Sequence, residues 1–118
     1  MPVRSLSSSV LKWPDAAQVQ TAARAWGTEQ RTRHPELVRL GVFGSYARGD
    51  AGVGSDLDLV AVVRQSSDPF ERRAASWDIT GLPVPSDILV YTEAEWDALL
   101  ARPGRFAAML RSEVEWIM

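Results

Sequence analysis

Apolar residues recur at helical spacing near the start of this chain. Within residues 15–33 they fall three or four positions apart and therefore share one face of a helix. The residues concerned are Val19, Ala22, Ala23 and Trp26. Pro14 and Asp15 favour a helix start at this point, and Pro35 predicts that the helix ends at about Arg33.

Three later runs are rich in branched and aromatic apolar residues, a composition typical of β-strands. They are Leu37–Phe43, Leu57–Val63 and Asp87–Tyr91. Gly44 ends the first run, and Gly52 and Gly54 mark a loop before the second. A final short strand is expected over residues 114–117.

Polar residues at capping positions predict helices between and after these strands. A short helix is expected over residues 45–49, and a capping box from Asp68 to Glu71 predicts a helix to about residue 77. Thr92 and Glu95 form a second capping box, which opens a helix that Pro103-Gly104 ends. A last short helix is expected over residues 106–111.

This order of elements predicts an α/β protein of the α+β kind. We expect one domain over residues 1–118, with a short mixed β-sheet and helices packed on one face. Residues 1–13 are expected to form an N-terminal extension to this domain.

The composition excludes several classes of protein. The chain has 118 residues, no cysteine and a formal net charge of −2. Without cysteine there is no disulfide scaffold, thiolate zinc site or cysteine nucleophile, and a cytoplasmic setting is expected. No long basic run indicates direct nucleic-acid binding, and no apolar run approaches the roughly 20 residues that cross a membrane. The serine-rich N-terminus lacks the apolar segment of a signal peptide.

Asp56 and Asp58 are the first candidates for chemistry. Side chains two apart on a strand share one face, so these carboxylates are expected to lie side by side. Their repulsion is relieved by a hard divalent cation, and a ligand set of oxygen atoms alone favours Mg²⁺. Asp87 opens the next strand and is the best third carboxylate. There it would hold a second ion and help to deprotonate an acceptor hydroxyl.

A phosphate-binding turn is expected directly before these acids. Gly44 permits close approach of the backbone to a ligand, and Ser45 adds a hydroxyl donor. Free N–H groups at the start of a helix bind phosphate, and Arg48 adds a positive charge one turn later. Hydrogen-bond donors for phosphate and paired acids within this stretch together predict a site for a nucleoside triphosphate with Mg²⁺. Two Mg²⁺ ions are expected.

These residues resemble a known signature. Gly44-Ser45-Tyr46-Ala47-Arg48-Gly49 followed by Ser55-Asp56-Leu57-Asp58-Leu59 resembles the DNA polymerase β-like nucleotidyltransferase superfamily. The pattern is most similar to the minimal nucleotidyltransferases (MNT domains), which include antitoxins paired with HEPN-domain toxins.

The resemblance implies a set of assignments. Gly44 and Ser45 would hold the β- and γ-phosphates of ATP, with support from Arg48, and Asp56, Asp58 and Asp87 would bind Mg²⁺. AMP would pass to a hydroxyl group, that of a tyrosine on a HEPN toxin, and so the chain would act as an antitoxin by AMPylation. Two alternatives stay open: transfer to a small molecule such as an aminoglycoside, and a binding module that retains the fold without catalysis. The sequence leaves homo-oligomer formation undecided.

Some other polar residues favour ordinary structural roles. His34, the only histidine, is expected on the surface at a helix end, and Arg72 and Arg73 on a solvated helix face. Tyr46 fits either the nucleotide pocket or the core. Trp116 is a candidate for a partner interface.

Overall fold

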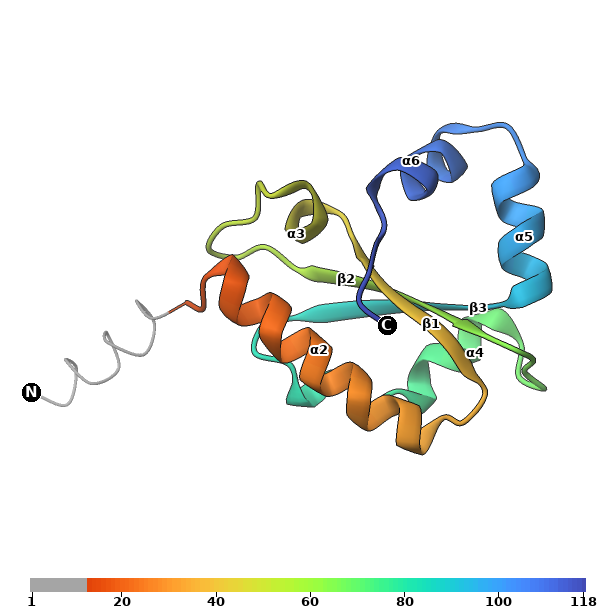
Figure 1. Cartoon of the computed structure of the whole chain (residues 1–118), viewed down its shortest axis with the longest axis horizontal. Coiled ribbons are helices and arrows are strands. Elements are labelled where there is room, and N and C mark those ends of the chain that lie inside the picture. Colours follow the sequence, from red (N-terminus) through yellow and green to blue (C-terminus); the bar gives the residue numbers. More distant parts are fainter. Residues whose placement is uncertain (1–12) are drawn as a thin grey trace, which may run out of the picture.

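The computed structural model describes residues 13–118, so nearly all of the expected N-terminal extension lies outside the described residues. Helices and strands alternate along the first part of this region (Figure 1). The helices are α2 (Ala16–Arg33), α3 (Ser45–Arg48), α4 (Phe70–Arg73), α5 (Glu93–Ala101) and α6 (Arg105–Glu113). Two 3-10 turns, η1 (Ala74–Ser76) and η2 (Ile79–Gly81), follow α4. The strands are β1 (Leu37–Phe43), β2 (Leu57–Val63), β3 (Ser86–Thr92) and β4 (Glu115–Trp116).

The strands form one mixed sheet in the order β3-β2-β1-β4. β1 is antiparallel to β2 and to β4, whereas β2 and β3 run parallel. Parallel neighbours need a crossover connection, and α4, η1 and η2 supply it between β2 and β3. The α+β class and the mixed sheet are therefore confirmed.

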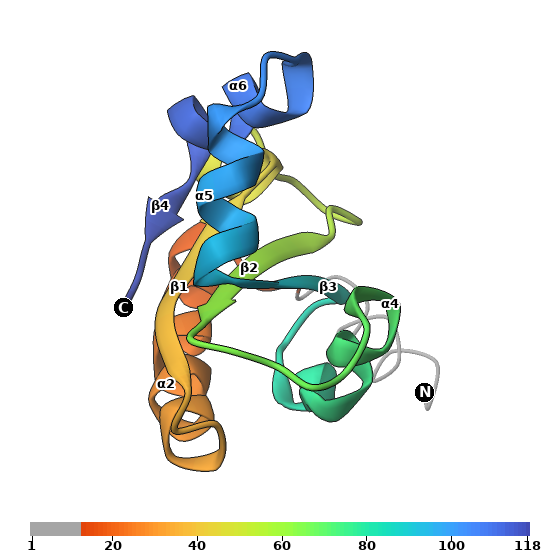
Figure 2. The same cartoon turned by 90° about the vertical axis from the view of Figure 1, so that its right-hand side faces the viewer.

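Two apolar clusters lie on opposite faces of the sheet. Leu59 and Ala61 of β2 belong to the cluster that contains Val19 and Ala23 of α2. The alternate residues of the same strand, among them Val60, pack in a cluster with helices α5 and α6. Figure 1 and Figure 2 show α2 along one side of the sheet and α5 and α6 on the other. The sequence predicted helices on one face only, and the second layer comes from α5 and α6.

Most predicted boundaries agree with the structure, because they depend on local signals. β1 and β2 begin and end at the predicted residues, and α2 ends at Arg33. Thr92 caps α5 in a complete capping box with Glu95. The capping box predicted at Asp68 is wrong. Pro69 is the N-cap of α4, and no side chain caps this helix with a hydrogen bond. α4 is correspondingly short and continues into η1.

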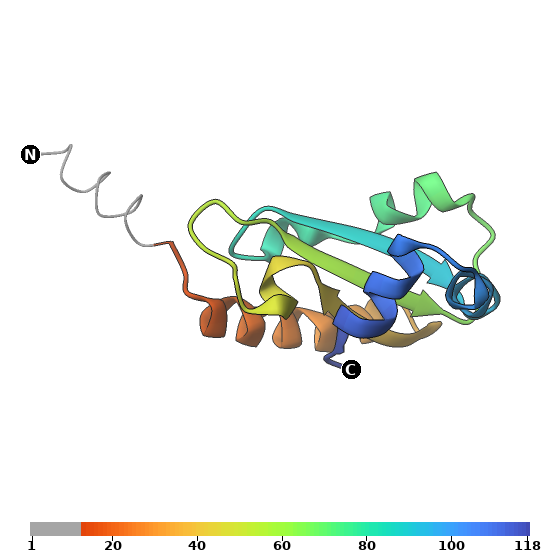
Figure 3. The same ribbon diagram turned by 90° about the horizontal axis from the view of Figure 1, so that it is seen from above.

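Across residues 13–118 no helix combines the length and the apolar character that a membrane crossing requires. Figure 3 shows the sheet from above, with α2 along one side and α4 beyond β3 on the other.

Candidate active site

The predicted site residues gather at one end of the sheet. Because β2 is antiparallel to β1 and parallel to β3, the end of β1 meets the starts of β2 and β3. Asp58 pairs with Phe43 on one side and with Asp87 on the other. The tertiary structure thus brings Asp87 beside Asp58, as the sequence analysis expected, although 29 positions separate them in the chain.

Asp58 and Asp87 lie on the same face of the sheet. Leu57 and Leu59 belong to the cluster on the α2 side, so Asp58 between them faces the side of α5 and α6. Paired residues of neighbouring strands share a face, which places Asp87 with it. Burial raises the pKa of the Asp58 carboxyl, and the charges of Asp87 and then Asp56 raise it further. A cation bound here would therefore relieve the unfavourable burial and crowding of negative charge at Asp58.

Asp56 lies directly before β2 and not within it. The backbone N–H of Leu57 donates to the carbonyl of Pro85 at 2.9 Å and fixes this junction against the start of β3. Asp56 and Asp87 are exposed, whereas Asp58 is half-buried. No three His, Cys, Asp or Glu side chains within residues 13–118 already surround one point as metal ligands do. The oxygen donors suit Mg²⁺, and Asp56 and Asp87 would have to turn toward Asp58 to share it.

The backbone of Gly44 touches the Asp58 carboxylate. Gly44 is the N-cap of α3 with φ 75° and ψ −152°, a region that only glycine adopts readily. A Cβ atom at this position would lie 2.3 Å from Oδ2 of Asp58. Glycine is therefore required here by its conformation and by its close approach to the acid.

Ser45 is the first residue of α3, next to this contact. The carbonyl of Gly44 accepts from the N–H groups of Ala47 and Arg48, both at 3.0 Å. The N–H groups at the start of a helix have no partner within that helix, so those of the Ser45 turn are available to a ligand.

Arg48 connects the turn to α6. Its Nε lies 3.2 Å from Oδ2 of Asp50, and its Nη1 lies 3.2 Å from Oε1 of Glu113. The positive charge of Arg48 also acts to lower the pKa of Asp58, against the larger effects that raise it. Sequence reasoning missed Glu113, which is 65 positions from Arg48 and carries no local signal.

Two residues outside this site, His34 and Arg73, differ from their expected roles. His34 is not a free surface residue, because its ring stacks on Trp77 with a centroid distance of 3.8 Å. Arg73 is buried and not solvated. Trp116 is half-buried and packs edge-on against Trp96, at 5.5 Å between ring centroids.

The chain is similar to nucleotidyltransferase domains of known proteins. A family model described as a nucleotidyltransferase domain matches residues 28–105, which include all six predicted site residues. No curated protein sequence matches the chain. Among solved structures, the chain is similar to a Sulfolobus solfataricus protein described as a nucleotidyltransferase, with a TM-score of 0.59 and 25% identity. That match covers 70% of this chain and 75% of the other. A second similar structure is a toxin-antitoxin with AMP-PNP, with a TM-score of 0.47 and 16% identity. That match covers 80% of this chain and 72% of the other.

Proposed function

Because the chain belongs to the nucleotidyltransferase domain family, we propose that it transfers AMP from ATP to a hydroxyl group with the help of Mg²⁺. The observation that carries this proposal is the register of β2 and β3. It sets Asp58 beside Asp87 at the end of the sheet where Gly44 begins the α3 turn. Acids and a phosphate-binding turn then act on one nucleotide.

The α3 turn holds the triphosphate in this proposal. Gly44 and Ser45 bind the β- and γ-phosphates through the backbone N–H groups and the serine hydroxyl. Arg48 adds a positive charge beside them, and its contacts with Asp50 and Glu113 limit the positions its guanidinium can take. The turn therefore orients the α-phosphate toward the acids at the start of β2.

The three carboxylates hold Mg²⁺. Asp56, Asp58 and Asp87 are the ligands, and the raised pKa of Asp58 supports this assignment, since a carboxyl beside two others is stabilised by a cation. When bound, Mg²⁺ would neutralise the negative charge on the phosphate oxygens.

Transfer proceeds by direct displacement. The acceptor oxygen attacks the α-phosphorus of ATP and forms a new P–O bond. The bond from that phosphorus to the oxygen bridging the α- and β-phosphates breaks, and pyrophosphate leaves with both bonding electrons. Asp87 accepts the hydroxyl proton, because it is exposed to an incoming acceptor and lies beside Asp58 on the neighbouring strand.

The acceptor in this proposal is a tyrosine of a partner protein, a HEPN-type toxin that the chain inactivates as an antitoxin. The resemblance of the Gly44 to Asp58 motif to MNT antitoxins supports this acceptor. Exposure of Asp56 and Asp87 supports it too, since a side chain on another protein reaches open carboxylates more readily than enclosed ones.

Labelled ATP tests the proposal. The protein is incubated with [α-³²P]ATP, Mg²⁺ and the protein encoded by the neighbouring gene. We expect label on a tyrosine of the neighbour, and we expect none when the double change Asp56→Asn and Asp58→Asn is made. Asp97→Asn, which removes an exposed acid on α5 outside the site, is the matched control and leaves labelling unchanged.

The outcomes separate the parts of the proposal. Pyrophosphate release with small hydroxylated acceptors, but no label on the neighbour, would refute the protein acceptor and keep the reaction. Neutralisation of a toxic neighbour by the double variant would show that contact alone suffices. No transfer to any acceptor by the folded protein would refute the reaction itself.

A further inference from the structure

Two acids from different parts of the fold hold Arg48. One is Asp50, two positions further along the chain, and the other is Glu113, the last residue of α6. α3 packs mainly on β1 and β2, whereas α6 packs mainly on α5. The contact with Glu113 therefore ties the phosphate turn to a helix that lies 65 positions away in the chain.

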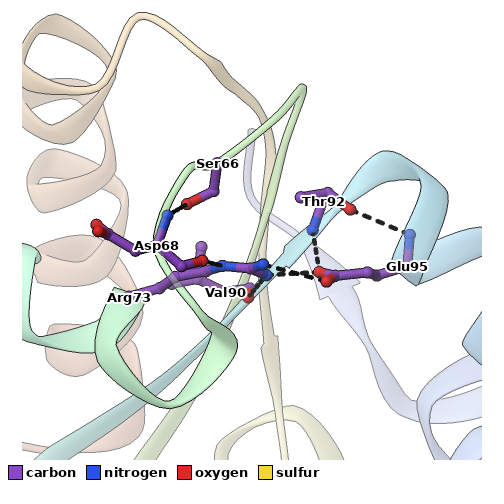
Figure 4. Close-up of polar contacts among 6 residues, drawn as sticks. All are labelled: Ser66, Asp68, Arg73, Val90, Thr92 and Glu95. Carbon is purple, nitrogen blue, oxygen red and sulfur yellow. Dashed lines mark hydrogen bonds and ion pairs between the residues drawn. The ribbon is translucent and has the colours of Figure 1, made fainter.

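A second arginine shows how a structural ion pair is built in this protein. Arg73 donates to both carboxylate oxygens of Glu95 and to the carbonyls of Asp68 and Val90 (Figure 4). Four of the five N–H groups of its guanidinium are thus engaged, and its side chain is only 8% exposed. Arg73 is therefore committed to holding α4 against β3 and α5.

Arg48 differs from Arg73 in each of these respects. Its side chain is 47% exposed, and its hydrogen bonds within residues 13–118 go to the side chains of Asp50 and Glu113, one to each. Two of the five N–H groups are used in this way, which leaves three for an anion such as a phosphate. The arrangement holds the guanidinium and still leaves it donors for a ligand.

The stability of the fold does not account for Glu113. At the last position of α6 the helix dipole disfavours an acid, and an ion pair with a half-exposed arginine adds little to stability. Glu113 is nevertheless the more enclosed of the two acids, because its side chain is 22% exposed and that of Asp50 is 61% exposed. Glu113 is therefore the firmer support for Arg48.

Arg48 needs such a support because a third acid also attracts it. Its charge reaches Asp58, since it acts to lower the pKa of that carboxyl. A guanidinium drawn to Asp58 would leave the phosphate turn and would occupy a carboxylate that Mg²⁺ needs. We propose that Glu113 is a positioning residue, which keeps Arg48 at the phosphate turn and so sets the affinity of the site for the triphosphate. This inference rests on the proposed nucleotide site.

Calorimetric titration of the full chain with ATP and Mg²⁺ tests this role without requiring transfer. Glu113→Gln keeps the size of the side chain and removes its charge, so the hydrogen bond that holds Arg48 is weakened. We expect the Kd for ATP to rise about fivefold. The Kd for AMP, which lacks the β- and γ-phosphates, should not change. Glu115→Gln removes an exposed acid two positions later and is the matched control, with an unchanged Kd for ATP.

A double-mutant cycle decides whether Glu113 acts through Arg48. Arg48→Gln should itself weaken ATP binding, and adding Glu113→Gln should cause no further loss, because the side chain that Glu113 positions is gone. Additive losses, an equal loss for AMP, an unchanged Kd for ATP, or tighter binding of ATP by Glu113→Gln would each overturn the positioning role. A folded wild-type protein that binds no ATP would refute the nucleotide site itself, and this role with it.

Discussion

Replacement of Gly44 by alanine tests the contact on which the candidate site depends. Alanine at this position meets two obstacles, a backbone conformation that disfavours side chains and a Cβ atom 2.3 Å from Oδ2 of Asp58. The conformational strain alone costs on the order of 1–3 kcal/mol of unfolding free energy. Cβ contacts under 3.0 Å are essentially never seen, so the carboxylate oxygen must retreat by at least 0.7 Å, the difference between 3.0 and 2.3 Å.

A displacement of this size matters more for catalysis than for folding. Misplacement of a catalytic group by about 1 Å lowers rates by about 10²-fold, so Gly44→Ala should lose AMP transfer by roughly that factor. Gly104→Ala is the matched control. Gly104 has φ 146° and ψ 161°, in the region also reserved for glycine, but nothing lies within 4 Å of an added Cβ.

Two measurements separate strain from displacement. Guanidinium denaturation followed by tryptophan fluorescence gives the loss of unfolding free energy, which should be of the same order in both variants. Pyrophosphate release from ATP gives the loss of transfer, which should occur in Gly44→Ala alone. If both variants transfer at the same rate while folded, the contact between Gly44 and Asp58 does not set the geometry of the site.

Three further changes follow from charged residues. Asp58→Asn should abolish transfer and, at pH 7 without Mg²⁺, raise the free energy of unfolding. Burial and two neighbouring acids raise the pKa of Asp58, so its ionised form opposes folding. A variant that is less stable than wild type in denaturant titrations would contradict this reasoning. Glu95→Gln should lower the free energy of unfolding by about 1–2 kcal/mol at neutral pH. This is less than the roughly 3–5 kcal/mol lost when a fully buried ion pair is broken, because the Glu95 side chain is 43% exposed. Hydrogen bonding to Arg73 lowers the pKa of Glu95 to about 2 from 4.5, so its stabilisation is complete above pH 4.5 and should vanish as the pH falls through 2; a difference from wild type that persists at pH 2 would refute this. Arg48→Gln should raise the KM for ATP in steady-state assays, whereas Arg31→Gln on the exposed side of α2 should not; equal KM values would exclude a role for Arg48 in triphosphate binding.

The sequence alone determined the local elements of this protein. β1 and β2 are runs rich in branched apolar residues, and the Thr92 cap depends on a partner three residues away, so neighbours in the chain carry enough information. The stretch from Gly44 to Asp58 was recognisable for the same reason. The capping box predicted at Asp68 failed because the Asp68 N–H, which the Glu71 side chain would accept from in such a box, donates to Oγ of Ser66, and α4 takes Pro69 as its N-cap.

Only the tertiary structure decided which distant charges meet. Asp87 lies beside Asp58 because β2 and β3 pair in parallel, and no spacing in the sequence fixes that register. The approach of Glu113 to Arg48 likewise depends on packing of α6 over the second face of the sheet. Side chains far apart in sequence are brought together by burial of apolar surface, which is non-directional, and so their pairing follows from the packed fold and not from local pattern.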